Sequence, residues 1–144
     1  MTTLDALQTA LAAEHAALHL YGVLGAQTSR SATPALHSAV ADAYAVHRGR
    51  RDELTRLVRD EGGTPVASEP TYEVPGQLGT VPRVTAAALD LERSCAETYA
   101  WLVANTAGPR RRWAVQALTD TAVRVLTFRG SPEIFPGAGE YADR

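Results

Sequence analysis

Apolar side chains in the first half of the chain recur at intervals of three and four residues, which is the spacing of one face of an α-helix. The first stripe predicts a helix over residues 3–27 and comprises Leu4, Leu7, Leu11, Leu18, Tyr21 and Leu24. The second predicts a helix over residues 34–61 and comprises Leu36, Val40, Ala43, Tyr44, His47, Leu54, Leu57 and Val58. Thr33 and Pro34 suit the N-cap and first position of this helix, and Gly62-Gly63 suits its end.

The second half of the chain carries two further apolar stripes. One predicts a helix over residues 83–106, with Leu89, Glu92, Ala96, Tyr99, Leu102 and Val103 along one side. Gly108-Pro109 interrupts the pattern. A fourth helix is predicted over residues 109–129, through Trp113, Val115, Leu118, Ala122, Val123, Val125 and Leu126, and Gly130 ends it.

Residues 62–82 show no helical periodicity and contain four prolines, Pro65, Pro70, Pro75 and Pro82. So long an irregular stretch inside one domain needs a structural reason. In a four-helix bundle, a crossover from one end to the other provides that reason, and the second and third helices then run parallel. The sequence therefore predicts an all-α, ferritin-like four-helix bundle over residues 1–130. An irregular tail, residues 131–144, is expected to pack partly on the bundle through Ile134 and Phe135.

Composition narrows the classes of partner. The net charge of −2 favours neither a nucleic acid nor an anionic membrane. A single cysteine, Cys95, excludes an internal disulfide and a metal site built from cysteines. The first residues lack the basic and apolar regions of a signal peptide, and no apolar run is long enough to span a bilayer. A cytoplasmic protein is the expectation.

The predicted topology raises the question of a di-metal site. Such bundles hold two metal ions with one Glu from each of two helices and a Glu-x-x-His pair from each of the other two. Glu14 lies in register with Leu11 and Leu18 on the first helix, and Glu92 shares a face with Leu89 and Ala96 on the third. Carboxylates inside apolar stripes are the pattern expected of inward-facing ligands.

The two Glu-x-x-His positions are incomplete. On the second helix the pair reads Tyr44 and His47, and on the fourth it reads Asp120 and Val123. Because a bridging carboxylate and an imidazole are missing, a di-iron oxidase is not expected. One divalent ion, Fe, Mn or Zn, remains possible at Glu14, His47, Glu92 and Asp120.

A metal-free arrangement explains the same residues and is the one we favour. Arg50 and Arg51 follow His47 by about one turn, and one of them is expected to face inward. An inward guanidinium would form an ion network with the buried carboxylates, as buried charges require. The predicted polar layer, or the lining of a pocket, comprises Glu14, Tyr44, His47, Arg50, Arg51 and Glu92.

Other candidate groups are weaker. His15 and His19 are spaced i, i+4 and could chelate a surface metal ion, although two helical histidines are most often just partly exposed. Cys95 reads as a small buried side chain rather than a nucleophile. The basic run at residues 110–112 reads as a solvated helix start rather than a phosphate site. Gly22 and Gly25 suggest the close approach of another segment or of a second subunit.

Several short segments together carry a resemblance to a family. They are Glu14-His15, Tyr21-Gly22, His47-Arg48-Gly49-Arg50-Arg51-Asp52, Gly62-Gly63-Thr64-Pro65, Glu69-Pro70-Thr71-Tyr72, Leu91-Glu92 and Phe135-Pro136-Gly137. On these segments, which span most of the chain, the sequence resembles small actinobacterial ferritin-like domains of uncharacterised function. The resemblance implies an antiparallel bundle with a left-handed crossover. It implies neither iron storage nor oxidase activity, because fold alone does not carry function.

Three functions remain open. The favoured one is a non-redox interaction or small-ligand-binding bundle, and no enzymatic activity is expected of it. The first alternative is a mononuclear metal protein with a degenerate di-iron-type site. The second is a purely structural homodimeric subunit. An exposed apolar patch around Gly22 and Gly25 or around Trp101 would support it.

Overall fold

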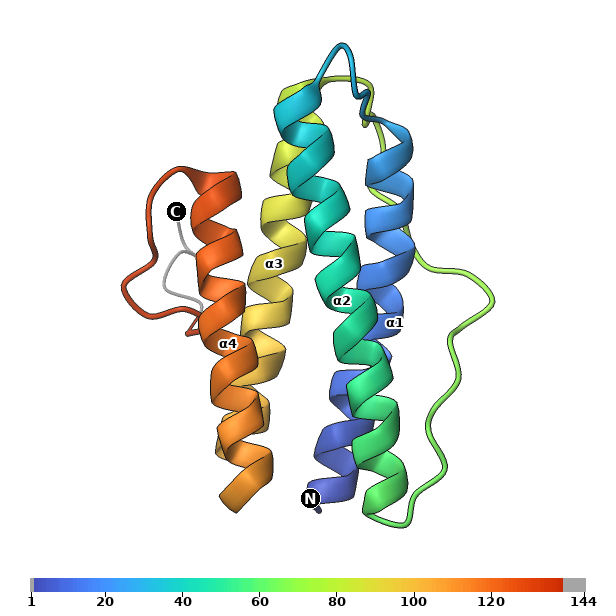
Figure 1. Ribbon diagram of the computed structural model, residues 1–144, viewed down its shortest axis with the longest axis vertical. Coiled ribbons are helices and arrows are strands. Elements are labelled where there is room, and N and C mark those ends of the chain that lie inside the picture. Colours follow the sequence, from blue (N-terminus) through green and yellow to red (C-terminus); the bar gives the residue numbers. More distant parts are fainter. Residues whose placement is uncertain (1, 139–144) are drawn as a thin grey trace.

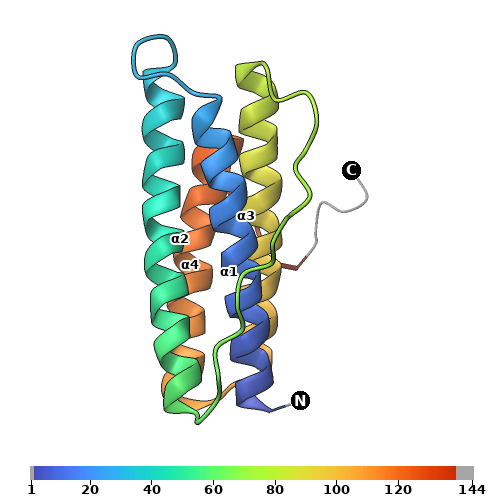
Figure 2. The same cartoon turned by 90° about the vertical axis from the view of Figure 1, so that its right-hand side faces the viewer.

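The computed structural model describes residues 2–138, which contain four helices and no strand. The helices are α1 (Thr3–Ala26), α2 (Pro34–Asp60), α3 (Val81–Ala104) and α4 (Gly108–Arg129). Within each of the pairs α1–α2 and α3–α4 the helices run antiparallel, whereas α2 and α3 run in the same direction (Figure 1). The crossover returns the chain from one end of the bundle to the other across the outer side of α1 (Figure 2). The predicted four-helix bundle with one long crossover is confirmed.

The helix starts use three different devices. Thr2 caps α1 in a capping box, because its side chain accepts from the Asp5 N–H and Asp5 accepts from the Thr2 N–H. Thr33 occupies the predicted N-cap of α2, but its hydroxyl bonds to Ser29 in the preceding turn and not to the helix. Thr80 caps α3, so this helix begins at Val81, two residues before the predicted start.

Glycines end two of the helices, as their positions predict. Gly62 has a φ of 80° just after α2, and Gly130 has a φ of 83° just after α4. Both values lie in the left-handed region, which glycine enters without a steric penalty. The amide of Gly130 bonds to the carbonyl of Leu126 and closes the last turn of α4.

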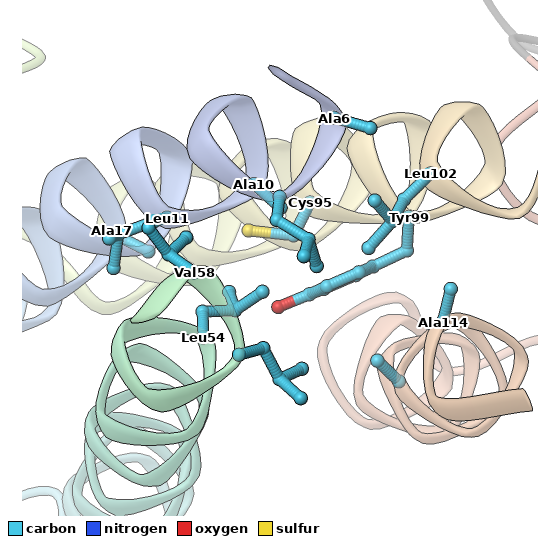
Figure 3. Packing of buried hydrophobic residues seen from close by; sticks show 13 residues of the cluster. Ala6, Ala10, Leu11, Ala17, Leu54, Val58, Cys95, Tyr99, Leu102 and Ala114 are labelled. Carbon is cyan, nitrogen blue, oxygen red and sulfur yellow. The ribbon is translucent and has the colours of Figure 1, made fainter. Parts of the chain in front are cut away.

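The core consists of two apolar clusters at different heights along the bundle. The first cluster is formed by Ala6, Leu7, Ala10, Leu11, Ala17, Leu54, Leu57, Val58, Cys95, Tyr99, Leu102, Ala114 and Ala117. Figure 3 shows Tyr99 extending from α3 between the other helices, with its hydroxyl in the interior. The second cluster is formed by Tyr21, Leu24, Val40, Ala43, Val84, Ala88 and Phe128. Between the two clusters, the interior positions are occupied by Glu14, His47 and Glu92.

The rotation of α4 about its axis differs from the prediction. Val115, Val123 and Leu126 were expected to face the core, yet all three are exposed, Val123 to 59%. The residues that face inward are Ala114, Ala117, Thr121, Val125 and Phe128. Apolar residues are distributed around the whole of α4, so their spacing does not define one face. The inward register is thus shifted from Asp120 to its neighbour Thr121.

The crossover is attached to the outer face of α1. The Gln8 side chain donates to the Thr64 carbonyl at 2.7 Å and accepts from the Val66 amide at 2.9 Å. His15 Nε2 donates to the Val66 carbonyl at 3.1 Å, and the His19 ring lies 5.3 Å from the ring of Tyr72. The two histidines therefore hold the crossover, and in this arrangement they do not form the i, i+4 metal chelate considered from the sequence.

The first part of the C-terminal tail lies against α3. Glu133 forms an ion pair with Arg93 at 2.8 Å, and Gly137 lies against the backbone of α3 at Ala96. Ile134 and Phe135, which the sequence predicts to pack on the bundle, are exposed to 77% and 67%. Residues 139–144 of the expected tail lie outside the described residues. Within residues 2–138, no helix is both long and apolar enough to cross a bilayer.

Candidate functional site

A histidine between two carboxylates forms the centre of the buried polar layer. His47 on α2 places Nδ1 2.6 Å from Glu14 Oε2 on α1 and Nε2 2.9 Å from Glu92 Oε1 on α3. All three side chains are almost completely buried. Each occupies a core position of its helix, with apolar residues one turn before and after it. The layer therefore joins three helices through charged hydrogen bonds.

The contacts of His47 determine its protonation state. A carboxylate can only accept hydrogen bonds, so each ring nitrogen must carry a hydrogen, which makes the ring an imidazolium. Burial alone would lower the pKa of His47, but the hydrogen bonds and charges of Glu14 and Glu92 raise it above its ordinary value. Burial likewise opposes ionisation of Glu92, yet His47 and Arg124 hold its pKa below the ordinary value. Both shifts favour the charged forms of His47 and Glu92 in the folded protein.

Two tyrosines also donate hydrogen bonds to the carboxylates of the layer. Tyr21 on α1 donates to Glu92 Oε1 at 2.5 Å, and Tyr99 on α3 donates to Glu14 Oε1. Burial, together with the neighbouring carboxylates, raises the pKa of both hydroxyls. They remain protonated donors throughout the physiological range. The Tyr21 ring also stacks on His47 with the ring centroids 5.3 Å apart.

Arg50 connects α2 to α4. Its guanidinium donates to Thr121 Oγ1 at 2.8 Å, to the Ala117 carbonyl at 3.0 Å and to Asp120 at 2.5 Å. The same group lies over the Tyr99 ring, 4.8 Å from its centroid, which is a cation–π arrangement. Only 7% of Arg50 is exposed. Of the two adjacent arginines considered from the sequence, Arg50 is therefore the one that faces the core.

Arg124 closes the layer on α4. It donates to Glu92 Oε2 at 3.2 Å and to Asp120 Oδ2 at 2.7 Å. Asp120 sits at the edge of the layer, and although partial burial opposes its ionisation, Arg124 and Arg50 lower its pKa. The three carboxylates, Glu14, Glu92 and Asp120, thus face three cations, His47, Arg50 and Arg124. No buried side-chain polar atom of residues 2–138 lacks a hydrogen-bond partner.

An open groove leads from the surface to this layer. The facing helices α2 and α4 pack less closely than the other neighbouring pairs, and the two ribbons are visibly separated (Figure 1). The inner part of the groove, about 250 Å³, is lined by Arg50, Glu53, Trp113, Gln116, Ala117 and Asp120. The outer part, about 280 Å³, shares Glu53, Trp113 and Gln116 and adds Arg56, Arg110 and Arg112. Arg50 is therefore both a member of the ion network and the floor of the groove.

Comparison with known sequences assigns the family. Residues 6–140 match the model of a family described as "Domain of unknown function (DUF4439)". The chain belongs to this family. In fold, this DUF4439 chain is similar to a conserved hypothetical protein, rv2844, from Mycobacterium tuberculosis, whose crystal structure matches with a TM-score of 0.80 and 29% sequence identity. The match covers 89% of this chain and 95% of the other. No curated protein matches the sequence.

The structure brings together four of the predicted layer residues, Glu14, His47, Arg50 and Glu92. Two others are not part of the layer. Tyr44 is 39% exposed, since the core positions of α2 are taken by Ala43 and His47 on either side of it. Arg51 points outward and pairs with Asp52 at 2.6 Å.

Sequence reasoning missed four members of the layer: Tyr21, Tyr99, Thr121 and Arg124. Tyr21 and Tyr99 were recognised as apolar stripe residues, but not as hydrogen-bond donors. Thr121 and Arg124 were missed because the register of α4 was misassigned. Thr121 and Arg124 are spaced i, i+3, like the two residues of a Glu-x-x-His motif. This spacing could have identified them, but the motif was placed one residue earlier, at Asp120 and Val123.

These side chains do not fit a metal ion. Both ring nitrogens of His47 already face carboxylates, and the carboxylate of Asp120 is engaged by two guanidinium groups. At the positions equivalent to a second Glu-x-x-His pair stand Thr121 and Arg124, and a guanidinium cannot coordinate a cation. No group of three potential His, Cys, Asp or Glu ligands occurs among residues 2–138 in a metal-binding arrangement.

The remaining candidates have structural surroundings. Cys95 is buried, and burial raises the pKa of its thiol well above the ordinary value, which disfavours a reactive thiolate. Arg110 pairs with Glu61 at 2.9 Å and Arg111 donates to the Val103 carbonyl, so these two arginines connect the start of α4 to α2 and α3. A Cβ added at Gly22 would meet no atom of the described chain within 4 Å. Close approach within the chain therefore does not explain Gly22, and a second subunit there stays a prediction.

Proposed function

We propose that this protein is a non-redox binding bundle, ferritin-like in plan, that takes a small anionic ligand in the groove between α2 and α4. The ferritin-like relationship is part of the proposal and is supported by the single crossover between the parallel helices α2 and α3. The observation that carries the proposal is the position of Arg50. A cation held rigidly by the ion network forms the floor of a groove that reaches the charged layer.

The charges of the groove favour an anion. Its lining contains four cationic side chains, Arg50, Arg56, Arg110 and Arg112, against two carboxylates, Glu53 and Asp120. Arg112 and Gln116 make no hydrogen bond or ion pair through their side chains to any described residue. These groups are available to a ligand, and the bidentate geometry of a guanidinium suits a carboxylate or a phosphate.

The wall of the groove favours a ligand with a planar ring. Trp113 lines both parts of the groove and offers a partly exposed aromatic surface. Its other side is fixed by an edge contact to Tyr99, at a centroid distance of 5.9 Å. A ring stacked on Trp113 would place an attached anionic group within reach of the arginines. The ligand class is therefore an aromatic or heterocyclic phosphate or carboxylate.

The ion network prepares the site without taking part in chemistry. Three hydrogen bonds to α4 and the contact with Tyr99 fix the Arg50 guanidinium before any ligand arrives. Binding to a preorganised cation avoids part of the entropy lost when a flexible side chain is ordered. In this proposal, cationic side chains occupy the positions at which a ferritin-like di-metal bundle would hold its metal ions.

The fluorescence of Trp113 provides the test. In a Trp101→Phe background Trp113 is the only tryptophan, and the probes are inorganic phosphate, benzoate and phenyl phosphate. We expect phenyl phosphate to change the emission at the lowest concentration, because it alone combines a ring with a dianion. Arg112→Gln should weaken its binding about tenfold, as expected from loss of a charged hydrogen bond of about 1.4 kcal/mol.

Arg48→Gln is the matched control, because it removes the same charge from the outward face of α2. It should leave the affinity for phenyl phosphate unchanged. If phenyl phosphate has no effect on Trp113 emission, or if both substitutions weaken binding equally, the groove is not an anion site and the proposal is wrong.

A further inference from the structure

A second cavity lies outside the bundle core, beneath the last part of the crossover. It has a volume of about 360 Å³, opens to the surface, and is lined by the crossover on one side and by α1 and α3 on the other. Its floor is apolar and is formed by Leu20, Leu78, Ala87 and Leu91, with Ala86 at its edge. The volume lies within the range of small-molecule sites, which are mostly apolar with a few polar groups.

The cavity exists because of the way in which the crossover is attached. Hydrogen bonds from Gln8 and His15 hold the first part of the crossover on α1, as described above. Further along, Gln77 adopts a left-handed conformation with a φ of 59° and is followed by Leu78, which packs against the second core cluster. Between these attachments, Pro75 and Gly76 of the crossover line the cavity together with the small side chains of Ala86 and Ala87 on α3.

Two charged side chains of α3 line the cavity, together with the hydroxyl residue Ser94. Arg83 lines the cavity, and its side chain makes no hydrogen bond or ion pair with any described residue. Asp90 lies two turns further along the same helix and is paired only loosely with Arg93, at 3.8 Å. One end of the cavity therefore offers a guanidinium for an anionic group, whereas the other end disfavours a second negative charge.

We propose that this cavity binds a small amphiphilic monocarboxylate, with its aliphatic body on Leu20, Leu78 and Leu91 and its carboxylate on Arg83. The apolar floor selects a hydrocarbon body, and the single available cation selects one negative charge. The cavity shares no lining residue with the groove between α2 and α4, so it is a second site that does not depend on the function proposed above.

Calorimetric titration with octanoate tests the proposal, with octanol and butyrate as comparison probes. Octanoate should bind with a stoichiometry of about one, octanol several-fold more weakly because it lacks the charge, and butyrate not measurably because its body is too short. Arg83→Gln should reduce the affinity for octanoate to that for octanol. Ala86→Leu, which places a larger side chain at the cavity edge, should weaken both octanoate and octanol.

Two matched variants control for charge and for helix effects. Arg59→Gln removes an exposed arginine at the end of α2, and Ala104→Leu adds the same bulk to an exposed position of α3; neither should change octanoate binding. Because Ala86 and Arg83 are exposed, both test variants are expected to fold, which the unfolding midpoint checks. Octanoate binding that is absent, or that is unaffected by both Arg83→Gln and Ala86→Leu, would overturn the proposal. Neither result tests ligand binding in the groove between α2 and α4, which the fluorescence of Trp113 measures.

Discussion

At the scale of single residues, the ionised groups of the interior are stable because every carboxylate oxygen of Glu14 and Glu92 has a donor. Glu14 accepts from Tyr99 and His47, and Glu92 accepts from Tyr21, His47 and Arg124. Transfer of a charge into a protein interior is strongly unfavourable unless it is paired and hydrogen-bonded. Removing one partner of such a buried pair therefore lowers the stability of the fold by more than the loss of an exposed ion pair would.

Glu14→Ala should lower the free energy of unfolding by about 3 kcal/mol, because it leaves Nδ1–H of the His47 imidazolium and the Tyr99 hydroxyl each without an acceptor. Urea unfolding followed by circular dichroism measures the change. Glu69→Ala, in the exposed crossover, is the control and should be nearly neutral. A Glu14→Ala protein that unfolds like the wild type would show that the ion network contributes nothing to stability.

The protonation of His47 predicts a pH dependence of stability. Its folded-state pKa is raised above the unfolded value of 6.5, so its contribution is complete below that pH and is lost as the pH rises through the folded-state pKa. The pKa of Glu92 is lowered below 4.5, so its contribution is complete above that pH and is lost as the pH falls through the folded-state value. Stability should therefore be greatest between about pH 4.5 and pH 6.5, where both contributions are complete.

Urea unfolding between pH 3 and about pH 8 measures this profile, below the pH of about 8.5 at which the cysteine of the unfolded chain ionises. In His47→Gln the decline on the alkaline side should disappear, while the decline on the acid side remains. An unchanged alkaline decline in that variant would assign it to another group. The ring NMR signals of His47 in the wild type report its titration directly.

At the scale of the elements, α4 is the helix whose orientation depends most on the others. Its apolar residues do not define one face, and its rotation is instead defined by polar contacts from neighbouring helices. Arg50 of α2 binds Thr121 and the Ala117 carbonyl, and Glu92 of α3 binds Arg124. A bundle in which α2 and α4 pack loosely thus retains a specific register through hydrogen bonds.

A pair of nearly isosteric substitutions on α4 tests this register. Thr121→Val removes the acceptor of the Arg50 guanidinium and should destabilise the protein by about 1–3 kcal/mol. Val123→Thr, two residues away on the exposed face, should change stability by no more than about 0.5 kcal/mol. Chemical unfolding of both variants gives the comparison. The reverse order would favour the register that the sequence pattern had predicted.

At the scale of the whole molecule, the charged layer divides the core into two apolar clusters and balances its own charges. Three fixed cations balance three carboxylates across all four helices. The bundle should therefore fold without metal. After expression in metal-supplemented medium and purification without chelator, elemental analysis should find iron, manganese and zinc far below one per chain. A chelator should leave the thermal midpoint unchanged. About one ion per chain, lost in His47→Ala, would restore the mononuclear metal site.

Much of the site was readable from the sequence because the first three helices have clear apolar faces. Glu14, His47 and Glu92 stand within such faces, so periodicity alone indicated that they point inward. The same reasoning failed for Val123, because α4 offers no dominant face. It also failed for Tyr44, since a position about 100° from Ala43 and about 60° from His47 was counted as part of the stripe of these core residues.

The sequence by itself determined the four helices, most of their ends and the crossover, because these depend on local periodicity and on the conformations of proline and glycine. It also indicated that Glu14, His47 and Glu92 would be buried. Only the tertiary structure decided the register of α4, the choice of Arg50 over Arg51 and the position of the two cavities. These features depend on which side chains of different helices come within hydrogen-bonding distance. Spacing along a single helix does not contain that information.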